Sequence, residues 1–456
     1  MASGCAEISA RNGSGNFSNN FSLFRVTSLD VGVKVAVIGG GSTYTPELIE
    51  GFAAHAGRLP IDELVLLDVD PQRLRVVGGF ARRILTKRGW PGVLTLTADR
   101  NQALEGADFI VIQLRVGGQQ ARLLDETLPL EFSTIGQETT GPGGFAKALR
   151  TVPVVLDIAE EVSRRSAKDA WIVDFTNPVG IVMQALLDEG HRAIGLCNSA
   201  MGFQRMVARL LGVAPNDVAL EHVGLNHLTW ERAAVVGGND RLPDLIHQSG
   251  AEIAAEIKIP VDLIRVLGAI PSSYLRYYYC SGEVLAEQLS GGKRSRAEEV
   301  MAIERTLLQM YEDPALDEKP ALLQQRGGAY YSEAAAQLIA SLYAGSGDLQ
   351  AVDIRNAGAI PDLPDDAVVE IPARIDRQGA RPARLRRLAP ELAGLVQQVK
   401  AYERLAVRAA IGGDRNVALK ALLANPLVPG YRTAAGLLAA LLDANRPHLP
   451  RFFPAG

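Results

Sequence analysis

The stretch that decides the fold reads VKVAVIGGGSTYTPEL and spans residues 33–48. It begins with a mostly apolar, β-branched run, residues 33–38, which is typical of a buried parallel strand. Three glycines follow at once, and Thr45-Pro46-Glu47 is typical of a helix start with proline in its first turn. A strand, a glycine turn and a helix in this order predict a dinucleotide site, because glycines let the backbone approach a pyrophosphate at the helix N-terminus.

The next predicted strand, residues 63–67, ends in Asp68. An acid at this place accepts the ribose hydroxyls of the nucleotide, which favours NAD over its 2′-phosphorylated relative. Two residues depart from the usual pattern. Tyr44 stands where the fingerprint has its third glycine, and Arg73 is close enough to Asp68 to leave the phosphorylated cofactor open. The alternative interpretation is a tight turn followed by an acid that caps a helix.

Strands and helices alternate as far as about residue 200. Further strands are predicted at residues 108–114, 171–175 and 193–196, and helices at residues 151–165 and 181–189. The predicted fold class is therefore α/β, with an N-terminal Rossmann-type doubly wound parallel sheet over residues 31–200 that binds NAD. Ligands of such sheets bind beyond the carboxyl ends of the strands, where the sequence has Arg115, Asn177 and Cys197.

The pattern changes after residue 200. Short strands are expected around residues 220–236 and 367–371, and long helices at residues 294–311, 332–343, 388–411 and 433–444. This mixture predicts a C-terminal mixed α+β domain over residues 201–456, which would carry the substrate and metal sites. Residues 1–30 are rich in Ser, Asn and Gly and lack the apolar block of a signal peptide, so a flexible N-terminal tail is expected.

The overall composition narrows the class of protein. With 456 residues, 47% hydrophobic and 21% charged, the chain can form one large or two smaller globular domains. Its formal net charge of −4 provides no attraction to nucleic acid or to an anionic membrane. No apolar run reaches the roughly 18 residues of a spanning helix, and three cysteines are usual in a reducing compartment. We expect a cytoplasmic enzyme without nucleic-acid or membrane partners.

Cys197 and His227 are the candidate metal ligands. Taken singly, each is more often structural, because a lone cysteine packs as a small hydrophobe and a lone histidine as a partly buried imidazole. Together, at the mouth of a cofactor sheet, a thiolate and an imidazole suit a catalytic transition metal with open positions. His222 is a rival ligand, but in an extended segment it is expected to point to the face opposite His227.

Two further segments have both a structural and a functional interpretation. Residues 271–279, PSSYLRYYY, form either an aromatic packing cluster or a site where a phenol beside a metal and an arginine becomes a base. Residues 136–144, GQETTGPGG, are predicted to be a loop after a strand. That loop is either a simple turn or a binding loop over the cofactor or substrate.

Read together, the motifs of this chain resemble glycoside hydrolase family 4, whose members are glycosidases that depend on NAD and a divalent metal. The resemblance runs from about Val33 to near the C-terminus. It rests on GGGSTYTPEL, RVGGQQAR, IGQETTGPGGFAKALR, FTNPVGI, GLCN, GLNHLTW and PSSYLRYYY. The family does not use two catalytic carboxylates, which agrees with our finding no such pair in the sequence.

The resemblance implies a redox route to hydrolysis. In the family, nicotinamide takes a hydride from carbon 3 of the sugar, and a tyrosine then removes the acidified proton on carbon 2. The aglycone leaves by elimination, water adds, and the hydride returns. The metal, usually manganese, holds the oxygens on carbons 2 and 3 as a Lewis acid.

The resemblance also assigns roles by motif position. The metal ligands would be Cys197 and His227, and the base would be Tyr274, with Tyr277 and Tyr278 as weaker candidates. The substrate would contact Arg122, Asn177 and Arg296, with Arg294 as a rival for the last position. NAD would meet Gly39, Gly41, Ser42 and Asp68.

Asn198, the residue after the proposed cysteine ligand, bears on the substrate. In family members that cleave 6-phospho-α-glucosides this position is an aspartate that serves as the leaving-group acid. An asparagine cannot donate a proton usefully, and the Cys-Asn pair resembles the 6-phospho-β-glucosidases. The expected substrate is therefore a phosphorylated disaccharide or β-glucoside, with the identity of the general acid left open.

Three alternatives stay open. The nearest is the same mechanism on an unphosphorylated, α-linked or uronic acid glycoside. A 2-hydroxy acid dehydrogenase has a similar cofactor sheet and a similar motif at Asn177-Pro178, but it would need a catalytic histidine and would convert NAD to NADH. The third is a non-enzymatic NAD sensor. The apolar C-terminal helices suggest a homodimer or homotetramer.

Overall fold

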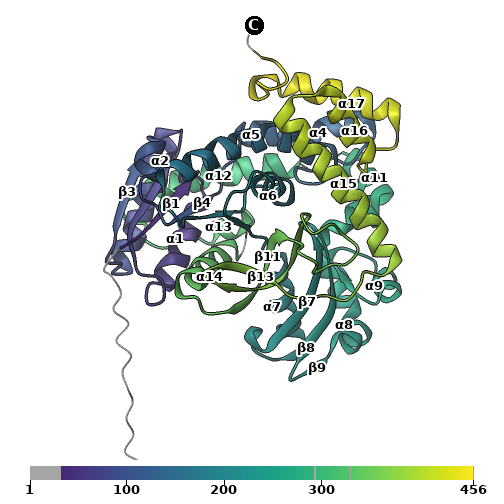
Figure 1. Cartoon of the computed structure of the whole chain (residues 1–456), viewed down its shortest axis with the longest axis horizontal. Coiled ribbons are helices and arrows are strands. Elements are labelled where there is room, and N and C mark those ends of the chain that lie inside the picture. The colour runs from purple at the N-terminus through teal and green to yellow at the C-terminus, as the bar shows by residue number, and fades with distance from the viewer. Residues whose placement is uncertain (1–31, 292–293, 329, 455–456) are drawn as a thin grey trace, which may run out of the picture. The chain divides into compact units, whose positions relative to one another are not determined.

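The computed structural model describes residues 32–291, 294–328 and 330–454. The predicted flexible tail, residues 1–30, lies outside the described residues. Val33–Gly456 form one compact unit, and its layers of helices around a central sheet are visible in Figure 1. None of the described helices is long and apolar enough to cross a membrane.

The main sheet has nine strands in the order β13-β12-β11-β6-β5-β4-β1-β2-β3. Six of them are parallel and contain all the predicted N-terminal strands; they are β1 (Val33–Ile38), β2 (Ile61–Leu67), β3 (Val93–Thr97), β4 (Phe109–Ile112), β5 (Trp171–Asp174) and β6 (Ala193–Gly195). The chain pairs β1 with both β2 and β4, so the strand order reverses at β1, where doubly wound sheets bind their ligands. The predicted α/β class is confirmed.

One parallel strand was not predicted. β3 lies at the edge of the sheet, and its residues are mostly half-buried or exposed. It therefore lacks the continuous apolar run that identifies the central strands, such as β4, which is buried throughout.

Three strands from the second half of the chain complete the same sheet. β11 (Asp348–Arg355) pairs antiparallel with β6, and β12 (Val368–Asp376) and β13 (Gly379–Pro382) follow as a meander. They cover the edge of β6, which a purely N-terminal sheet would leave unpaired. The main sheet contains strands from both sides of residue 200. The predicted division at that residue into an NAD-binding part and a substrate and metal part therefore stays a prediction.

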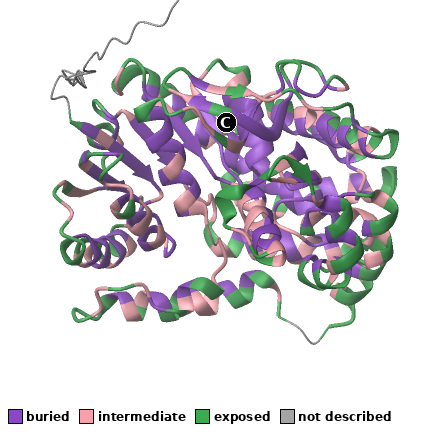
Figure 2. Ribbon diagram, turned by 90° about the horizontal axis from the view of Figure 1, so that it is seen from below, coloured by how far each residue is buried: buried purple, intermediate pink, exposed green. Residues whose placement is uncertain are grey.

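Helices pack around the parallel strands. α1 (Thr45–Ala54) contacts α2 (Pro71–Lys87) and α14 (Tyr331–Ala344). α5 (Gly141–Arg165) contacts α4 (Gly118–Thr127), α6 (Val179–Asp188) and α15 (Pro390–Gly412). The resulting core is continuous, and Figure 2 shows the buried central strands between more exposed outer helices.

A smaller sheet carries the GLNH motif. Its strands are β7 (Val218–Leu225), β8 (Leu228–Val236), β9 (Asn239–Asp240) and β10 (Ile270–Pro271). The remaining helices of the second half include α7 (Ser199–Leu211), α8 (Leu242–Ile257), α9 (Val261–Leu267), α11 (Ser281–Leu289), α12 (Arg296–Glu312), α16 (Arg415–Ala424) and α17 (Tyr431–Ala444). The predicted α+β character of the second half is confirmed.

Candidate active site

The glycine turn after β1 has the geometry that a nucleotide site requires. Gly39 has φ +90°, and a Cβ there would lie 2.8 Å from the carbonyl oxygen of Gln113. The Ser42 amide donates to the Gly39 carbonyl at 3.1 Å, which closes the turn just before α1. The structure therefore brings Gly39, Gly41 and Ser42 together between the end of β1 and the start of α1, as predicted for a pyrophosphate site.

Asp68 follows β2 and lies beside this turn. One carboxylate oxygen accepts the Gly41 amide at 2.8 Å, and the other accepts the Asp70 amide at 3.0 Å. A Cβ on Gly41 would come within 2.8 Å of the same carboxylate. Arg73, the residue that favoured the phosphorylated cofactor, donates to the Gly41 carbonyl at 3.2 Å and pairs with Glu304 at 3.5 Å. Its charge is thus already partly neutralised inside the protein.

The structure explains why Tyr44 stands in place of the third glycine. Its ring is buried and lies against Gly328, and its hydroxyl donates to the Gly328 carbonyl and accepts the Ser332 amide at 3.1 Å. From the same segment, Arg326 Nε donates a hydrogen bond to the hydroxyl oxygen of Thr43 at 2.7 Å. The cofactor turn is therefore held against residues nearly 300 positions away, which no local pattern could indicate.

A carboxylate whose side chain is only 12% exposed pairs with the cations near the strand ends. Glu138 pairs with Arg115, with Arg122 at 3.2 Å and with Lys147 at 2.7 Å. Burial alone would raise the pKa of Glu138, but these three cations hold it well below its usual range. Burial and the neighbouring Arg115 lower the pKa of Lys147 to about 7. Glu138 thus gathers Arg115, Arg122 and Lys147 near the strand ends, where their N–H groups can bind an anionic substrate.

The segment containing Glu138 differs from its predicted form. Residues 136–144 follow a 3-10 helix, Leu128–Phe132, rather than a strand, and Gly141 already begins α5. A Cβ on Gly143 would lie 2.2 Å from the Asp125 carbonyl oxygen, so the glycines permit close packing. The predicted helix start at residue 151 was ten residues late, because glycines and a proline in the first turns do not resemble a helix interior.

The predicted substrate residues differ in their surroundings. Arg122 on α4 is buried and also donates to Glu126 at 2.7 Å. Asn177 follows β5 and precedes a cis proline, and its side-chain oxygen is buried without a hydrogen-bond partner in the described protein. That acceptor is free for a hydroxyl of a bound molecule.

Arg296 lies at the first turn of α12, where its side chain is 43% exposed. It bonds to Glu299 at 2.9 Å and to the Gln325 carbonyl at 2.7 Å. The next amide, of Ala297, donates to Glu126, so this helix end adjoins the Arg122–Glu126 pair. Its rival Arg294 is exposed.

Cys197 and His227 are buried, and the half-buried Tyr274 lies beside them. His227 has φ 63° in the turn between β7 and β8, and its ring stacks on that of Tyr274 with centroids 3.8 Å apart. Cys197 follows β6 and is 4% exposed. Burial raises the pKa of Tyr274, and the nearby Cys197 thiolate raises it further. Tyr274 thus stacks on one candidate metal ligand and lies near the other, as the metal hypothesis requires.

The donors in this cluster fit a divalent cation with open positions. Burial lowers the pKa of His227 to about 4, so its imidazole is neutral near pH 7 and can bind a metal. Burial, with Glu370 and Asp353, raises the pKa of the Cys197 thiol, so a thiolate there needs a compensating cation. In the described ranges no group of three or more His, Cys, Asp or Glu is placed to hold a metal. Further ligands would come from substrate or water, as in a catalytic site.

The rival ligand His222 has other partners. Its Nδ1 lies 2.6 Å from Glu231 and its Nε2 lies 2.8 Å from Glu370, so both ring nitrogens are engaged. Asn198 immediately precedes α7, next to the cysteine.

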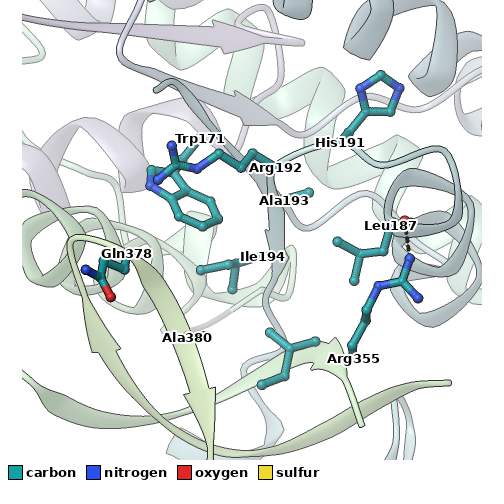
Figure 3. Close-up of a pocket in the computed structure, with 10 residues that line it drawn as sticks. Trp171, Leu187, His191, Arg192, Ala193, Ile194, Arg355, Gln378 and Ala380 are labelled. Atoms are coloured by element: carbon teal, nitrogen blue, oxygen red, sulfur yellow. Dashed lines mark hydrogen bonds between the residues drawn. The ribbon is translucent and has the colours of Figure 1, made fainter. Parts of the chain in front are cut away.

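A pocket elsewhere on the main sheet is unrelated to these residues. It opens at the beginnings of β5 and β6, where Arg192 stacks over the Trp171 ring at 4.2 Å (Figure 3). Asn177 and Cys197 follow the opposite, carboxyl ends of the same two strands. None of the predicted site residues lines this pocket.

Several residues near the site were not predicted from the sequence. Glu138 and Lys147 lie in the motif IGQETTGPGGFAKALR, which was predicted to contain a binding loop without a role for either residue, although an acid between glycines is a visible signal. Tyr331, on the first turn of α14, stacks on Phe175 with centroids 5.5 Å apart, and its pKa is raised by burial and by Cys197. Its YYS context carries no local signal, because only the fold brings it to the cysteine.

Two family models match the chain. The model described as family 4 glycosyl hydrolase matches residues 34–213, and the one described as family 4 glycosyl hydrolase C-terminal domain matches residues 222–428. Together they span the cofactor turn, the Cys197 strand end and the GLNH turn.

Individual relatives agree with these matches. A probable 6-phospho-β-glucosidase of Bacillus subtilis is 41% identical, with 92% of this chain and 98% of the relative covered. A 6-phospho-β-glucosidase of Escherichia coli is 38% identical, with 92% and 97% covered. The structure of the 6-phospho-β-glucosidase from Thermotoga maritima with manganese, NAD+ and glucose 6-phosphate superposes with a TM-score of 0.85 at 33% identity, covering 91% of this chain and 99% of that one.

Proposed function

The chain belongs to the family 4 glycosyl hydrolases, and from this premise we propose that it hydrolyses 6-phospho-β-glucosides with NAD and a divalent metal. The proposal rests on two observations taken together, one from the relatives and one from the site. Relatives named 6-phospho-β-glucosidases match over nine tenths of the chain, and its own Tyr274 stacks on the buried His227 and lies near the buried Cys197. Asn198 beside the cysteine supports the β-linked substrate over the α-linked one.

The cofactors would be held by the residues already described. NAD would bind at Gly39, Gly41, Ser42 and Asp68, and a divalent ion such as Mn2+ at Cys197 and His227. When bound, NAD supplies a hydride acceptor and donor, and the ion supplies Lewis acidity.

Tyr274 would take the proton from carbon 2 of the sugar. Burial raises the pKa of its phenol, whereas Arg122 is a neighbour that lowers it. The tyrosine therefore needs added positive charge at the moment of proton transfer, and it lies stacked on a histidine that would bind a cation. Tyr274 would therefore act as a base only when the metal ion is bound.

The substrate would be oriented by Arg122 and Asn177, with Arg296 at the adjoining helix end. Asn177 offers its unpartnered oxygen to a sugar hydroxyl. The cations around Glu138 provide the positive surroundings that a phosphorylated sugar needs. Residues 31–200 would thus supply most of the NAD contacts, and residues 201–456 the base and one metal ligand.

Two properties of the working enzyme complete the proposal. It acts in the cytoplasm, where its cysteines stay reduced, and it assembles as a homodimer or homotetramer. Light scattering of the purified protein tests the assembly: a monomer across a concentration series would contradict it.

The activity is tested with 4-nitrophenyl 6-phospho-β-glucoside under reducing conditions, with and without NAD and Mn2+. The unphosphorylated β-glucoside and the 6-phospho-α-glucoside are run in parallel. We expect nitrophenol release from the phosphorylated β-glucoside only when both cofactors are present, with no accumulation of NADH.

The other outcomes identify the alternatives. Release from an unphosphorylated or α-linked glycoside alone would keep the mechanism and change the substrate. NADH accumulation on a 2-hydroxy acid, with no glycoside cleaved, would indicate a dehydrogenase.

A further inference from the structure

A buried hydrogen-bonded network lies directly behind the turn that carries His227. Its members are the side chains of His222, Glu231, Glu370, Asn226 and Asp353. His222, Glu231, Glu370 and Asp353 are each no more than 1% exposed. None of the site roles described above uses Glu370, although burying carboxylates is costly unless they are paired. The burial of these carboxylates therefore needs a functional or structural explanation.

Glu370 connects two elements of the turn. One of its carboxylate oxygens lies 2.8 Å from His222 Nε2, and the other accepts the Asn226 side-chain amide at 2.9 Å. Asn226 is the first residue of the two-residue connection between β7 and β8, and His227 is the second. His222 lies three residues before the end of β7. One carboxylate thus bonds both to the strand that leads into the turn and to the turn itself.

His222 donates from both ring nitrogens, because each faces a carboxylate oxygen. Its Nδ1 lies 2.6 Å from Glu231, the residue opposite it in the β7–β8 register. Burial opposes a charge on this ring, but Glu231 and Glu370 outweigh it and raise the pKa of His222 to about 10. The ring is therefore a fixed double donor between two strands and Glu370.

The same network reaches the strand that leads to Cys197. Asp353 on β11 pairs in register with Glu370 on β12 on one side and with Gly195 on β6 on the other. Cys197 lies two residues beyond Gly195. A Cβ at Gly195 would come within 2.8 Å of Asp353, so a glycine is needed for this row to pack. Glu370 is thus linked to the surroundings of both candidate metal ligands.

We propose that Glu370 is a positioning residue of the metal centre, which holds the Asn226–His227 turn in place through its hydrogen bonds to Asn226 and His222. The proposal rests on the proposed function, because it presumes that Cys197 and His227 bind a divalent ion. Glu370 itself need not touch the ion. Groups that hydrogen-bond directly to a metal ligand typically change metal affinity by about 10- to 100-fold when removed. Glu370 acts through the residue next to His227, so an effect at the lower end of that range is expected.

Two substitutions separate positioning from general stability. Glu370→Ala removes both hydrogen bonds to the turn. Glu370→Gln can keep both, since its oxygen can accept from Asn226 while its amide donates to a His222 that has given up the Nε2 proton. Glu221→Ala is the matched control. That carboxylate also lies on β7, but its partners are Arg232 and Arg386.

The measurement is Mn2+ binding to the chelator-stripped, reduced full-length protein, followed by the electron paramagnetic resonance signal of free Mn2+. Circular dichroism and thermal unfolding of the metal-free proteins report folding separately. We expect Glu370→Ala to bind Mn2+ about 10-fold more weakly than the wild type, the lower end of the range for outer-shell groups. Glu370→Gln should bind close to the wild-type affinity, and Glu221→Ala should lower thermal stability without changing Mn2+ affinity.

Each other result has a definite meaning. Wild-type affinity in folded Glu370→Ala would overturn the positioning role, as would an equal loss in the glutamine and alanine variants. If the alanine variant does not fold, a loss in the folded glutamine variant still contradicts the proposal. Absence of Mn2+ binding in the wild type, also with NAD and glucose 6-phosphate present, would instead remove the metal from the proposed function, and this inference with it.

Discussion

Replacing Glu138 with glutamine tests the electrostatics of the site most severely. The substitution preserves size and shape but removes the carboxylate that pairs with Arg115, Arg122 and Lys147. The side chain of Lys147 is 2% exposed and that of Arg122 is 10% exposed, so water cannot replace the lost charge. Glu138→Gln should therefore destabilise the fold through uncompensated buried cations.

The expected size of the effect follows from the burial of these groups. Removing one partner of a buried ion pair costs about 3–5 kcal/mol. An unfolding entropy of roughly 2.1 cal/mol/K per residue gives about 0.9 kcal/mol/K for a unit of this length. The expected fall in Tm is thus about 3–6 °C at pH 6, where Lys147 is charged. Because the pKa of Lys147 is about 7, that residue loses its proton at higher pH and the penalty should shrink by pH 9.

The assay is thermal unfolding of the ligand-free protein and the variant at pH 6 and pH 9, compared with Glu131→Gln. Glu131 is an exposed glutamate in the nearby 3-10 helix, and its replacement should change stability by no more than about 0.5 kcal/mol. A Glu138→Gln variant as stable as the Glu131 control, or equally destabilised at both pH values, would refute the reasoning.

Further predictions concern the metal, the base and the buried network. Cys197→Ser should weaken Mn2+ binding without altering the circular dichroism spectrum. The control Cys280→Ser, at a half-buried free cysteine, should leave Mn2+ binding unchanged. Full Mn2+ affinity in Cys197→Ser would remove Cys197 from the site. Tyr274→Phe should suppress exchange of the carbon 2 proton with solvent, measured by NMR on the loaded enzyme, and normal exchange would transfer the role to another phenol such as Tyr277. His222 has a raised pKa, so its contribution to stability is complete below about pH 6.5 and is lost as pH rises through about 10. The Tm gap between wild type and His222→Gln should therefore narrow over this range, and a widening gap would contradict the charged imidazole.

The cofactor half of the fold could be predicted because its signals are local. The run at residues 33–48 contains strand, turn and helix start in one window, and Asp68 closes the second strand. The structure places Asp68 against Gly41, within one hydrogen bond of the turn. Continuous apolar strands and glycine turns need no knowledge of distant contacts.

The rest of the site depends on contacts across the whole chain. Glu370 reaches Asn226 from a strand 144 residues away, and Arg326 reaches Thr43 across 283 residues. Neither residue lies in a pattern that distinguishes it from other charged residues. Residue types and strand-end positions indicated the ligand pair Cys197 and His227, whereas they left several tyrosines equivalent, and only the family resemblance selected Tyr274.

The measurement that most directly tests the account is hydrolysis of a 6-phospho-β-glucoside in D2O by the enzyme loaded with NAD and Mn2+. If the bond is broken by oxidation, proton removal from carbon 2 and elimination, the product glucose 6-phosphate will carry deuterium at carbon 2, visible by NMR. A product with hydrogen retained at carbon 2, formed at the same rate without NAD, would contradict the account and indicate direct hydrolysis.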